Sequence, residues 1–425
     1  MSWSRRYAVM SYLQSAIWTV PVFALVLEQA TFRIAHVQRL DFGGIPGFIL
    51  DKAGSLAETD YIIASAIAFI VFTFSSLIVA IQVASGQLTP RIIATTLLRD
   101  KAIRRSVALF IYTLLLAVHV KTRIDDVPRF VTSLLGILGL LSVIVFMFLI
   151  DYAARMLRPV SIVWRIAQQG LKVIDDVYPS AMRAAPESPQ VLSQLGAPDL
   201  TVLHGGSSAI VIAVNLRALV AAARNADAII EVVPRVGDFV SRDDPLFRLR
   251  GRGAARLGQR FLRGQVAFGR ERTIEQDSTF AFRVIVDIAL KALSPAINDP
   301  TTAVLAIDQL QRLLRAVGKR DLHDERIFDS DRQLRVVFRT PNWNDFVQLT
   351  FSEIRQFGAA SMQVVRRLHA MIDNVLQSLP ERRWPAIREQ SELLNRAAQR
   401  LFVFPEDLQL ARVPDSQGLG GASEP

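Results

Sequence analysis

Residues 61–84 read YIIASAIAFIVFTFSSLIVAIQVA, an unbroken apolar stretch of 24 residues without a charged side chain. About 20 apolar residues are enough to cross a hydrocarbon core of about 30 Å, so this stretch predicts a membrane-spanning helix. Working outward from it, similar runs lie at residues 7–27, 106–120 and 130–150. The sequence therefore predicts an α-helical bundle of four transmembrane helices within residues 1–160.

The composition fits a membrane protein and excludes several chemistries. Of the 425 residues, 51% are hydrophobic and the mean hydropathy is +0.29, which is too apolar for a disordered chain. No cysteine is present, which excludes disulfides, thiolate catalysis and cysteine-held metals. The five histidines are scattered along the sequence, so no local metal motif exists. We therefore expect no metal ion and no cofactor.

Basic residues in the short loops predict the orientation of the chain. The segment between the second and third predicted spans is the most basic, with Arg91, Arg99, Lys101, Arg104 and Arg105. An excess of such residues favours the cytoplasmic side. We expect a multi-pass protein of the inner (plasma) membrane with both termini in the cytoplasm and an irregular external segment at residues 31–60. The first apolar run exceeds the core of a secretory signal, so we expect it to be an uncleaved anchor.

The rest of the chain is more polar, and its patterns predict a cytoplasmic α+β region with a small β unit and C-terminal helices. Strand patterns occur at residues 228–233 and 334–339, and a strand pair is expected within 238–250. The predicted divisions are, in chain order, a transmembrane domain (1–160), a juxtamembrane helix and linker (161–206), a mixed β unit (207–250), an Arg/Gly-rich segment (251–272), a mainly helical domain (273–412) and a disordered tail (413–425).

Helical periodicity is strongest towards the C-terminus. One helix should begin at an N-cap formed by Asp299, with Pro300 in its first position, and run to residue 317. The other predicted helices of the polar region cover residues 162–178, 215–224, 279–293, 344–379 and 381–401.

Three blocks of the sequence carry a resemblance. They are QVASGQLTPR (82–91), VGDFV (236–240) and GRERTIEQDSTFAFRVIVDIALKALSPAINDPTTA (269–303). Together with the four predicted spans, these blocks resemble a family of bacterial predicted membrane proteins, domain of unknown function 2254. The resemblance implies a multi-pass architecture and a bacterial membrane location. It implies no reaction.

The second predicted span carries a candidate polar seam, formed by Thr73, Ser76, Gln82 and Gln87. In one interpretation these side chains line a conduction path in a homo-oligomer. In the other, small and hydroxylated residues let helices pack closely, with hydroxyls bonding to neighbouring backbone. Gln82 is the most informative residue, because an amide at membrane depth needs a polar partner or water.

A candidate polar pocket in the cytoplasmic region would combine carboxylates and amides, namely Gln276, Asp277, Asp287, Asn298 and Asp299. Such oxygen atoms suit a divalent cation or a cationic ligand. The alternative is structural: Arg283, Asp287 and Lys291 form an ion-pair ladder on one helix face, and Asp299 only caps a helix.

A basic stretch follows the predicted β unit. Its candidate lipid-binding arginines are Arg252, Arg256, Arg260 and Arg263. Such residues are attracted to anionic lipid headgroups, although a solvated loop would have the same composition. Few aromatic residues lie between them for bases to stack on, so we do not expect nucleic-acid binding.

No phosphate-binding glycine loop, GxSxG or HExxH motif is present, so we identify no catalytic residues, and an enzyme acting at the membrane is only the third hypothesis. The leading hypothesis is an oligomeric channel-like or small-solute permeation protein with a cytoplasmic regulatory domain. The alternative is a membrane-anchored sensor or scaffold whose cytoplasmic domain binds a partner or ligand. In both hypotheses the lipid bilayer surrounds the spans.

Overall fold

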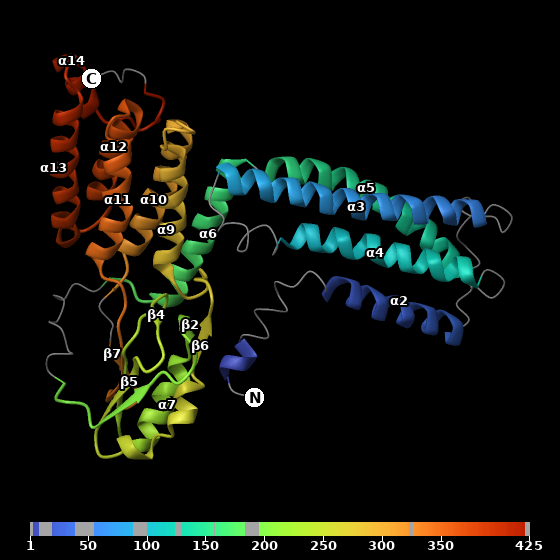
Figure 1. The fold of residues 1–425 in the computed structure, drawn as a ribbon, viewed down its shortest axis with the longest axis horizontal. Coiled ribbons are helices and arrows are strands. Elements are labelled where there is room, and N and C mark those ends of the chain that lie inside the picture. Colours follow the sequence, from blue (N-terminus) through green and yellow to red (C-terminus); the bar gives the residue numbers. More distant parts are fainter. Residues whose placement is uncertain are drawn as a thin grey trace. The chain divides into compact units, whose positions relative to one another are not determined.

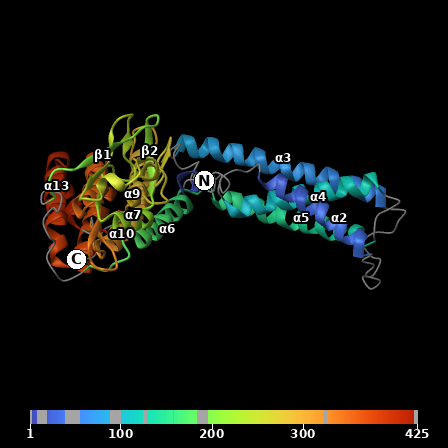
Figure 2. The same ribbon diagram turned by 90° about the horizontal axis from the view of Figure 1, so that it is seen from below.

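The chain forms two compact units, which we call the N-terminal unit, chiefly residues 12–161, and the C-terminal unit, chiefly residues 162–425. Figures 1 and 2 show helices alone in the first and helices with strands in the second. The computed structural model describes residues 3–7, 19–38, 55–87, 100–123, 129–156, 158–182, 195–322 and 326–420.

The N-terminal unit consists of long apolar helices (Figure 1). The helices are α2 (Thr19–Gln38), α3 (Ser55–Gln87), α4 (Lys101–Thr122) and α5 (Arg129–Met156). Among the described residues, three segments are long and apolar enough to cross a membrane, namely Glu58–Val79, Lys101–Thr122 and Phe130–Met156. These segments confirm the membrane-type helices predicted at 61–84, 106–120 and 130–150.

The first predicted span, residues 7–27, is not confirmed. Tyr7 lies in a short N-terminal helix that groups with the C-terminal unit, and its hydroxyl donates to Glu275 there. Residues 8–18 lie outside the described residues. The remainder of the prediction falls in α2, which begins at Thr19 and is not among the three candidate spans found in the described part of the chain.

The external segment predicted at residues 31–60 is helical at both ends, since α2 continues into it and α3 begins within it. Phe32 and Ala35 of α2 are buried in an apolar cluster with residues of α4 and α5. Packing of this kind stabilises a helix beyond its intrinsic propensity. Residues 39–54 of the predicted segment lie outside the described residues.

Polar contacts near the helix ends show the directions in which the helices run. Arg104, at the start of α4, donates to the hydroxyl of Thr19 at the start of α2, at 3.0 Å. Tyr152, near the end of α5, donates to Asp100 at the start of α4, at 2.6 Å. Thus α4 is parallel to α2 and antiparallel to α5, as expected when successive helices alternate in direction.

The C-terminal unit begins with α6 (Pro159–Val177), in agreement with the amphipathic helix predicted at 162–178. Gly170 lets α6 pack closely on α9 (Ser278–Ala292) and α10 (Pro300–Gly318). A Cβ atom at Gly170 would lie 2.7 Å from the Cβ of Ala281 and 3.1 Å from a methyl of Leu313. The buried face of α6 comprises Ile162, Val163, Ile166, Ala167, Gly170, Val173 and Ile174.

Two sheets lie in the C-terminal unit, with strand orders β1-β5-β3-β8-β7 and β4-β2-β6. All neighbouring strands are antiparallel except β3 and β8. Helix α7 (Leu216–Ala226) shares an apolar core with the larger sheet. The strands are β1 (Leu200–Leu203), β2 (Ala209–Val214), β3 (Ile229–Val232), β4 (Phe239–Val240), β5 (Pro245–Arg250), β6 (Val266–Gly269), β7 (Arg326–Phe328) and β8 (Leu334–Phe338).

Strands predicted at 228–233 and 334–339 are confirmed as β3 and β8, but the strand pair predicted within 238–250 is wrong. Its two strands, β4 and β5, belong to different sheets. The side chain of Asp244 accepts the backbone N–H of Ser241 at 2.7 Å and closes a tight turn between them. This turn redirects the chain into the second sheet instead of folding it back as a hairpin.

The five-stranded sheet takes its strands from several of the predicted domain divisions. β1 lies within residues 161–206, predicted as a helix and linker, and β7 and β8 lie within 273–412, predicted as mainly helical. The parallel pairing of Ile230 with Val336 joins strands distant in sequence, which local patterns do not reveal. The predicted Arg/Gly-rich segment, 251–272, forms a 3₁₀ turn η4 (Ala254–Arg256), α8 (Gln259–Arg263) and β6.

The remaining helices are α11 (Trp343–Gly358), α12 (Met362–Ser378), the 3₁₀ turn η5 (Glu381–Arg383), α13 (Trp384–Leu401) and α14 (Pro405–Arg412). The predicted N-cap is confirmed, because the Asp299 carboxylate accepts the N–H of Thr302 at 3.0 Å. The single helix predicted at 344–379 is instead two helices, α11 and α12. A Cβ at Gly358 would lie 2.6 Å from Val364, so the chain folds back tightly at this glycine.

The tail predicted to be disordered at 413–425 is folded as far as it is described, to residue 420. The Asp415 carboxylate accepts backbone N–H groups from Gln417, Gly418 and Gly420, at 2.7 to 3.0 Å. The turn packs on α12, where the guanidinium of Arg366, which is fully buried, donates to backbone carbonyls of the tail. Residues 421–425 lie outside the described residues.

Candidate functional site: a basic groove on helix α10

The residues of the predicted membrane seam lie on α3, where helical spacing puts Thr73, Ser76 and Gln87 on one face and Gln82 on the opposite face. Thr73 is buried, and its hydroxyl donates to the carbonyl of Phe69 in its own helix at 2.6 Å. Ser76 is half-buried, whereas Gln82 is exposed and lies beyond Val79, the last residue of the candidate span. Nine residues correspond to two and a half helical turns, so Thr73 and Gln82 point to opposite sides.

Gln87, the last residue of the predicted seam, is the final residue of α3, and its side chain lies outside what the structure describes. Thr73 and Gln82 therefore cannot line a common path along one helix. A conduction path along the face that carries Thr73 and Ser76 stays a prediction.

A buried ionisable pair in the N-terminal unit was not predicted. Glu28 of α2 is 2% exposed, and its carboxylate lies 2.5 Å from Nδ1 of His119 on α4. The ring of Phe32 stacks on His119, with centroids 3.9 Å apart. Sequence position suggested that both residues lie at the ends of spans. Only the parallel packing of α2 and α4 brings them together.

The predicted polar pocket in the C-terminal unit is not formed, because its members have separate structural roles. Asp277 caps α9 and Asp299 caps α10. Asp287 pairs with Arg283, about 15 Å along α9 from the Asp277 cap. The other two members are Gln276, which accepts the N–H of Val214, and Asn298, which adopts a positive φ in the turn before α10.

Asp277 is nevertheless an unusual carboxylate. Burial raises its pKa, although the Thr279 hydroxyl and the charge of Arg272 act in the opposite direction. Among the residues that the structure describes, no group of three or more histidine and carboxylate side chains is placed to hold a metal ion.

The predicted lipid-binding arginines lie on η4, α8 and the loop before them. Three of them, Arg252, Arg256 and Arg260, are exposed, and no ion pair to any of them occurs among the described residues. Arg263 is half-buried and donates to the carbonyl of Leu203 at 2.9 Å. Three of the four predicted residues are therefore accessible to a ligand, and the fourth connects α8 to β1 through a hydrogen bond.

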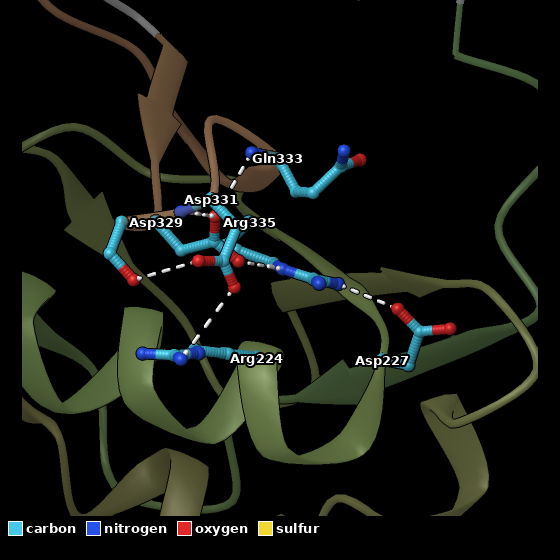
Figure 3. Close-up of polar contacts among 7 residues, drawn as sticks. Arg224, Asp227, Asp329, Asp331, Gln333 and Arg335 are labelled. Atoms are coloured by element: carbon cyan, nitrogen blue, oxygen red, sulfur yellow. Dashed lines mark hydrogen bonds and ion pairs between the residues drawn. The ribbon is translucent and has the colours of Figure 1, made fainter.

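Carboxylates and arginines also cluster at the β7–β8 turn (Figure 3). Asp329 accepts the backbone N–H groups of Asp331 and Gln333, each at 2.9 Å, and the side chain of Arg335 at 2.7 Å. The hydrogen bond from Arg335 lowers the pKa of Asp329. Arg335 also reaches Asp227 at the end of α7, at 2.9 Å. All these contacts are internal, so the cluster fastens the turn to α7.

In the centre of the larger sheet, Glu231 is fully buried. Its two carboxylate oxygens receive Arg248 at 3.3 Å and Arg250 at 2.8 Å, both from the neighbouring strand β5. Two of the eight arginines in the basic stretch 248–272 therefore neutralise a buried carboxylate and are not free to bind a partner.

A groove of about 300 Å³ runs along α10 in the C-terminal unit, with Leu171 of α6 as one wall. This volume is at the lower end of the range for small-molecule sites. The side chains of α10 that line it recur at helical spacing and so share one face. They are Asp308, Gln311, Arg312, Arg315 and Ala316, and Lys319 completes the lining directly after the helix, at its C-cap.

The acidic and amide groups of this groove are already engaged by α12. Arg367, which is buried, donates to Asp308 at 2.6 Å and to Gln311 at 2.8 Å. The amide of Gln311 in turn donates to Asn374 at 3.0 Å. The single carboxylate of the groove therefore has its own cation.

The cations of the groove have no such partner. Among the described residues, no carboxylate forms an ion pair with Arg312, Arg315 or Lys319. Arg312 is held by the neutral amide of Gln168 on α6, whose oxygen faces both terminal guanidinium nitrogens at 2.8 and 2.9 Å. The groove thus presents three uncompensated positive charges on a small concave surface.

Sequence reasoning missed this groove, although part of the signal was present. Arg312, Arg315 and Lys319 follow i, i+3 and i+7 spacing in or just beyond a helix that was correctly predicted. The contact of Gln168 on α6 with Arg312, and the ion pair of Arg367 on α12 with Asp308, depend on tertiary packing. The spacing of charges along α10 alone does not predict these two contacts.

Comparison with known proteins gives a consistent family assignment. Uncharacterised proteins of Mycobacterium bovis and Mycobacterium tuberculosis are 28% identical to this chain over 433 residues. The alignments cover 95% of this chain and 80% of each relative. No solved structure matches the chain.

The family model for DUF2254, described as predicted membrane protein, matches residues 9–374. The match extends from the membrane helices through both sheets to α12, and so includes the groove on α10. The chain therefore belongs to the DUF2254 family of predicted membrane proteins, as the three sequence blocks indicated.

Proposed function

We propose that this membrane protein is an anchored sensor, in which the C-terminal unit binds a ligand and α6 transmits the binding to the membrane helices. The observation that carries the proposal is the position of α6 in the chain. Only residues 157 and 158 separate it from α5, while its apolar face is buried in the core of the C-terminal unit. A shift of α6 against α9 and α10 would therefore pull on the last membrane helix.

A permeation function has less support. Within the described part of the N-terminal unit, the Thr73 hydroxyl bonds inside its own helix and Gln82 lies past the end of the span. The buried ionisable pair, Glu28 and His119, compensates itself. A conducting path would need several subunits to supply polar groups that these helices do not present together.

We further propose that the protein lies in the inner membrane with the C-terminal unit in the cytoplasm. The basic loop between α3 and α4 supports this orientation. A ligand of the sensor would then be a cytoplasmic molecule.

Because the chain contains no cysteine, one introduced thiol can report on the end of α5. We would replace the exposed Ala154 with cysteine and measure its rate of maleimide labelling in the purified full chain. Gly170→Ala should displace α6, because the new Cβ would meet Ala281 at 2.7 Å. If α6 transmits its displacement to the end of α5, this substitution changes the labelling rate at residue 154 several-fold.

The matched control is Gly196→Ala, where a Cβ meets nothing within 4 Å, and it should leave the labelling rate unchanged. Far-ultraviolet circular dichroism would verify that the protein remains folded in both variants. Equal labelling rates in the parent, Gly170→Ala and Gly196→Ala proteins would overturn the sensor proposal.

A further inference from the structure

We infer that the groove between α6 and α10 is a binding site for a small phosphorylated molecule carrying at least two negative charges. The inference rests on the proposed function for its biological meaning, since it names the class of ligand that the sensor would detect. The binding itself stands on the charges and shape of the groove alone.

The first argument is the charge balance. Asp308, the carboxylate among the lining residues, already has Arg367 as its partner at 2.6 Å. Arg312, Arg315 and Lys319 remain without a carboxylate among the described residues. Like charges at such helical spacing repel one another, so folding alone gains nothing from placing them together. A bound anion would convert this repulsion into attraction.

The second argument is that one guanidinium is held in place without being neutralised. The Gln168 oxygen faces the terminal nitrogens of Arg312 at 2.8 and 2.9 Å and restrains the side chain beside the groove. An amide carries no charge, so Arg312 keeps its full positive charge. A restrained, uncompensated guanidinium is suited to charge-assisted hydrogen bonds with phosphate oxygens.

The third argument concerns size. From Arg312 to Lys319 the helix rises about 10 Å, which exceeds the reach of one phosphate group but suits two anionic groups joined in one molecule. A groove of about 300 Å³ admits a small metabolite and excludes a folded partner. Leu171 and Ala316 supply apolar contacts for its uncharged part.

The test uses the purified full chain in neutral detergent, with pyrophosphate as the probe and calorimetric titration as the readout. We expect saturable binding of pyrophosphate and weaker binding of inorganic phosphate, because the latter cannot reach both ends of the groove. Replacing Arg312 or Arg315 with glutamine should weaken pyrophosphate binding about tenfold each, and Lys319→Gln somewhat less.

The control variants are Arg252→Gln and Arg256→Gln, which remove exposed arginines elsewhere in the same unit. They should leave the affinity unchanged. Absence of binding, or equal losses in groove and control variants, would overturn the inference. The same titration is repeated in bilayer discs of phosphatidylglycerol and, as a control, in discs of phosphatidylcholine. If a lipid headgroup is the source of the phosphate, phosphatidylglycerol should compete with pyrophosphate and weaken its apparent binding, whereas phosphatidylcholine should not.

The two proposals fail in different ways. If pyrophosphate binds through the groove arginines but does not alter maleimide labelling at Ala154→Cys, the site stands and the sensor proposal falls. If Gly170→Ala changes the labelling rate but no phosphorylated probe binds, the proposal that α6 transmits a displacement to α5 stands. The inference that the groove binds a phosphorylated molecule is then wrong.

Discussion

In the part of the chain that the structure describes, each unit buries one glutamate, and the two glutamates face different basic side chains. Glu231 in the sheet of the C-terminal unit is fully buried and faces two arginines, Arg248 and Arg250. Glu28 in the N-terminal unit is 2% exposed and faces His119. Arginine keeps its charge at every accessible pH, whereas histidine carries a charge only when protonated.

The difference corresponds to the surroundings of each unit. In the sheet, water at the rim solvates Arg248, so a permanent ion pair persists at modest cost. In the N-terminal unit the carboxylate of Glu28 faces one imidazole, that of His119, between α2 and α4. The C-terminal unit thus holds its buried glutamate with two guanidinium groups from a neighbouring strand, and the N-terminal unit holds its own with one histidine from a neighbouring helix.

The largest expected effect comes from removing one charge in the sheet. Glu231→Gln leaves Arg250, whose side chain is 12% exposed, without a counter-charge, and should destabilise the C-terminal unit by about 3 kcal/mol. Chemical unfolding followed by tryptophan fluorescence measures the loss. A variant as stable as the parent would show that the arginines find other partners.

The second effect concerns His369 of α12, a histidine that remains neutral. Burial, and to a lesser extent the charge of Arg412, lowers its pKa to about 4. The unfolded chain takes up this proton near pH 6.5, so the native state loses stability as the pH falls from about 6.5 towards 4. Between pH 7 and pH 5 the loss should be about 2 kcal/mol.

His369→Leu removes the titrating group and should flatten this part of the stability curve. Unfolding of the parent and variant at pH 7 and pH 5 provides the comparison. Parallel curves would mean that other groups control the acid sensitivity of the C-terminal unit.

The smallest effect is expected in the N-terminal unit. Glu28→Gln keeps a hydrogen-bonding group opposite His119 and should cost about 1 kcal/mol or less, since polar contacts between membrane helices are worth little. Loss of helical circular dichroism in a denaturing detergent series measures it. A cost equal to that of Glu231→Gln would break the comparison.

Several elements could be predicted from the sequence because their signals are local. Uncharged runs identified α3, α4 and α5, and the Asp299–Pro300 pair located the start of α10 within one residue. Apolar periodicity identified α6. In each case the interactions that favour the helix are between residues close in sequence, or between the helix and the surrounding lipid or water. The local sequence is therefore enough to predict the helix.

Other elements depend on contacts that are distant in sequence. β3 pairs with β5 and β8, and nothing near Ile230 indicates Val336 as its neighbour. The predicted polar pocket failed for the converse reason: Asp277 and Asp299 are helix caps, a local role that satisfies each carboxylate where it stands. The groove was missed because Gln168 and Arg367, which shape it, come from α6 and α12.

The contact between α12 and the tail has a consequence for synthesis of the chain. The guanidinium of Arg366 donates to the carbonyls of Val413 and Gly420. A ribosome makes residue 366 first and must add more than fifty residues before the second acceptor exists. The native environment of this buried arginine is therefore complete only after residue 420 has been added to the chain.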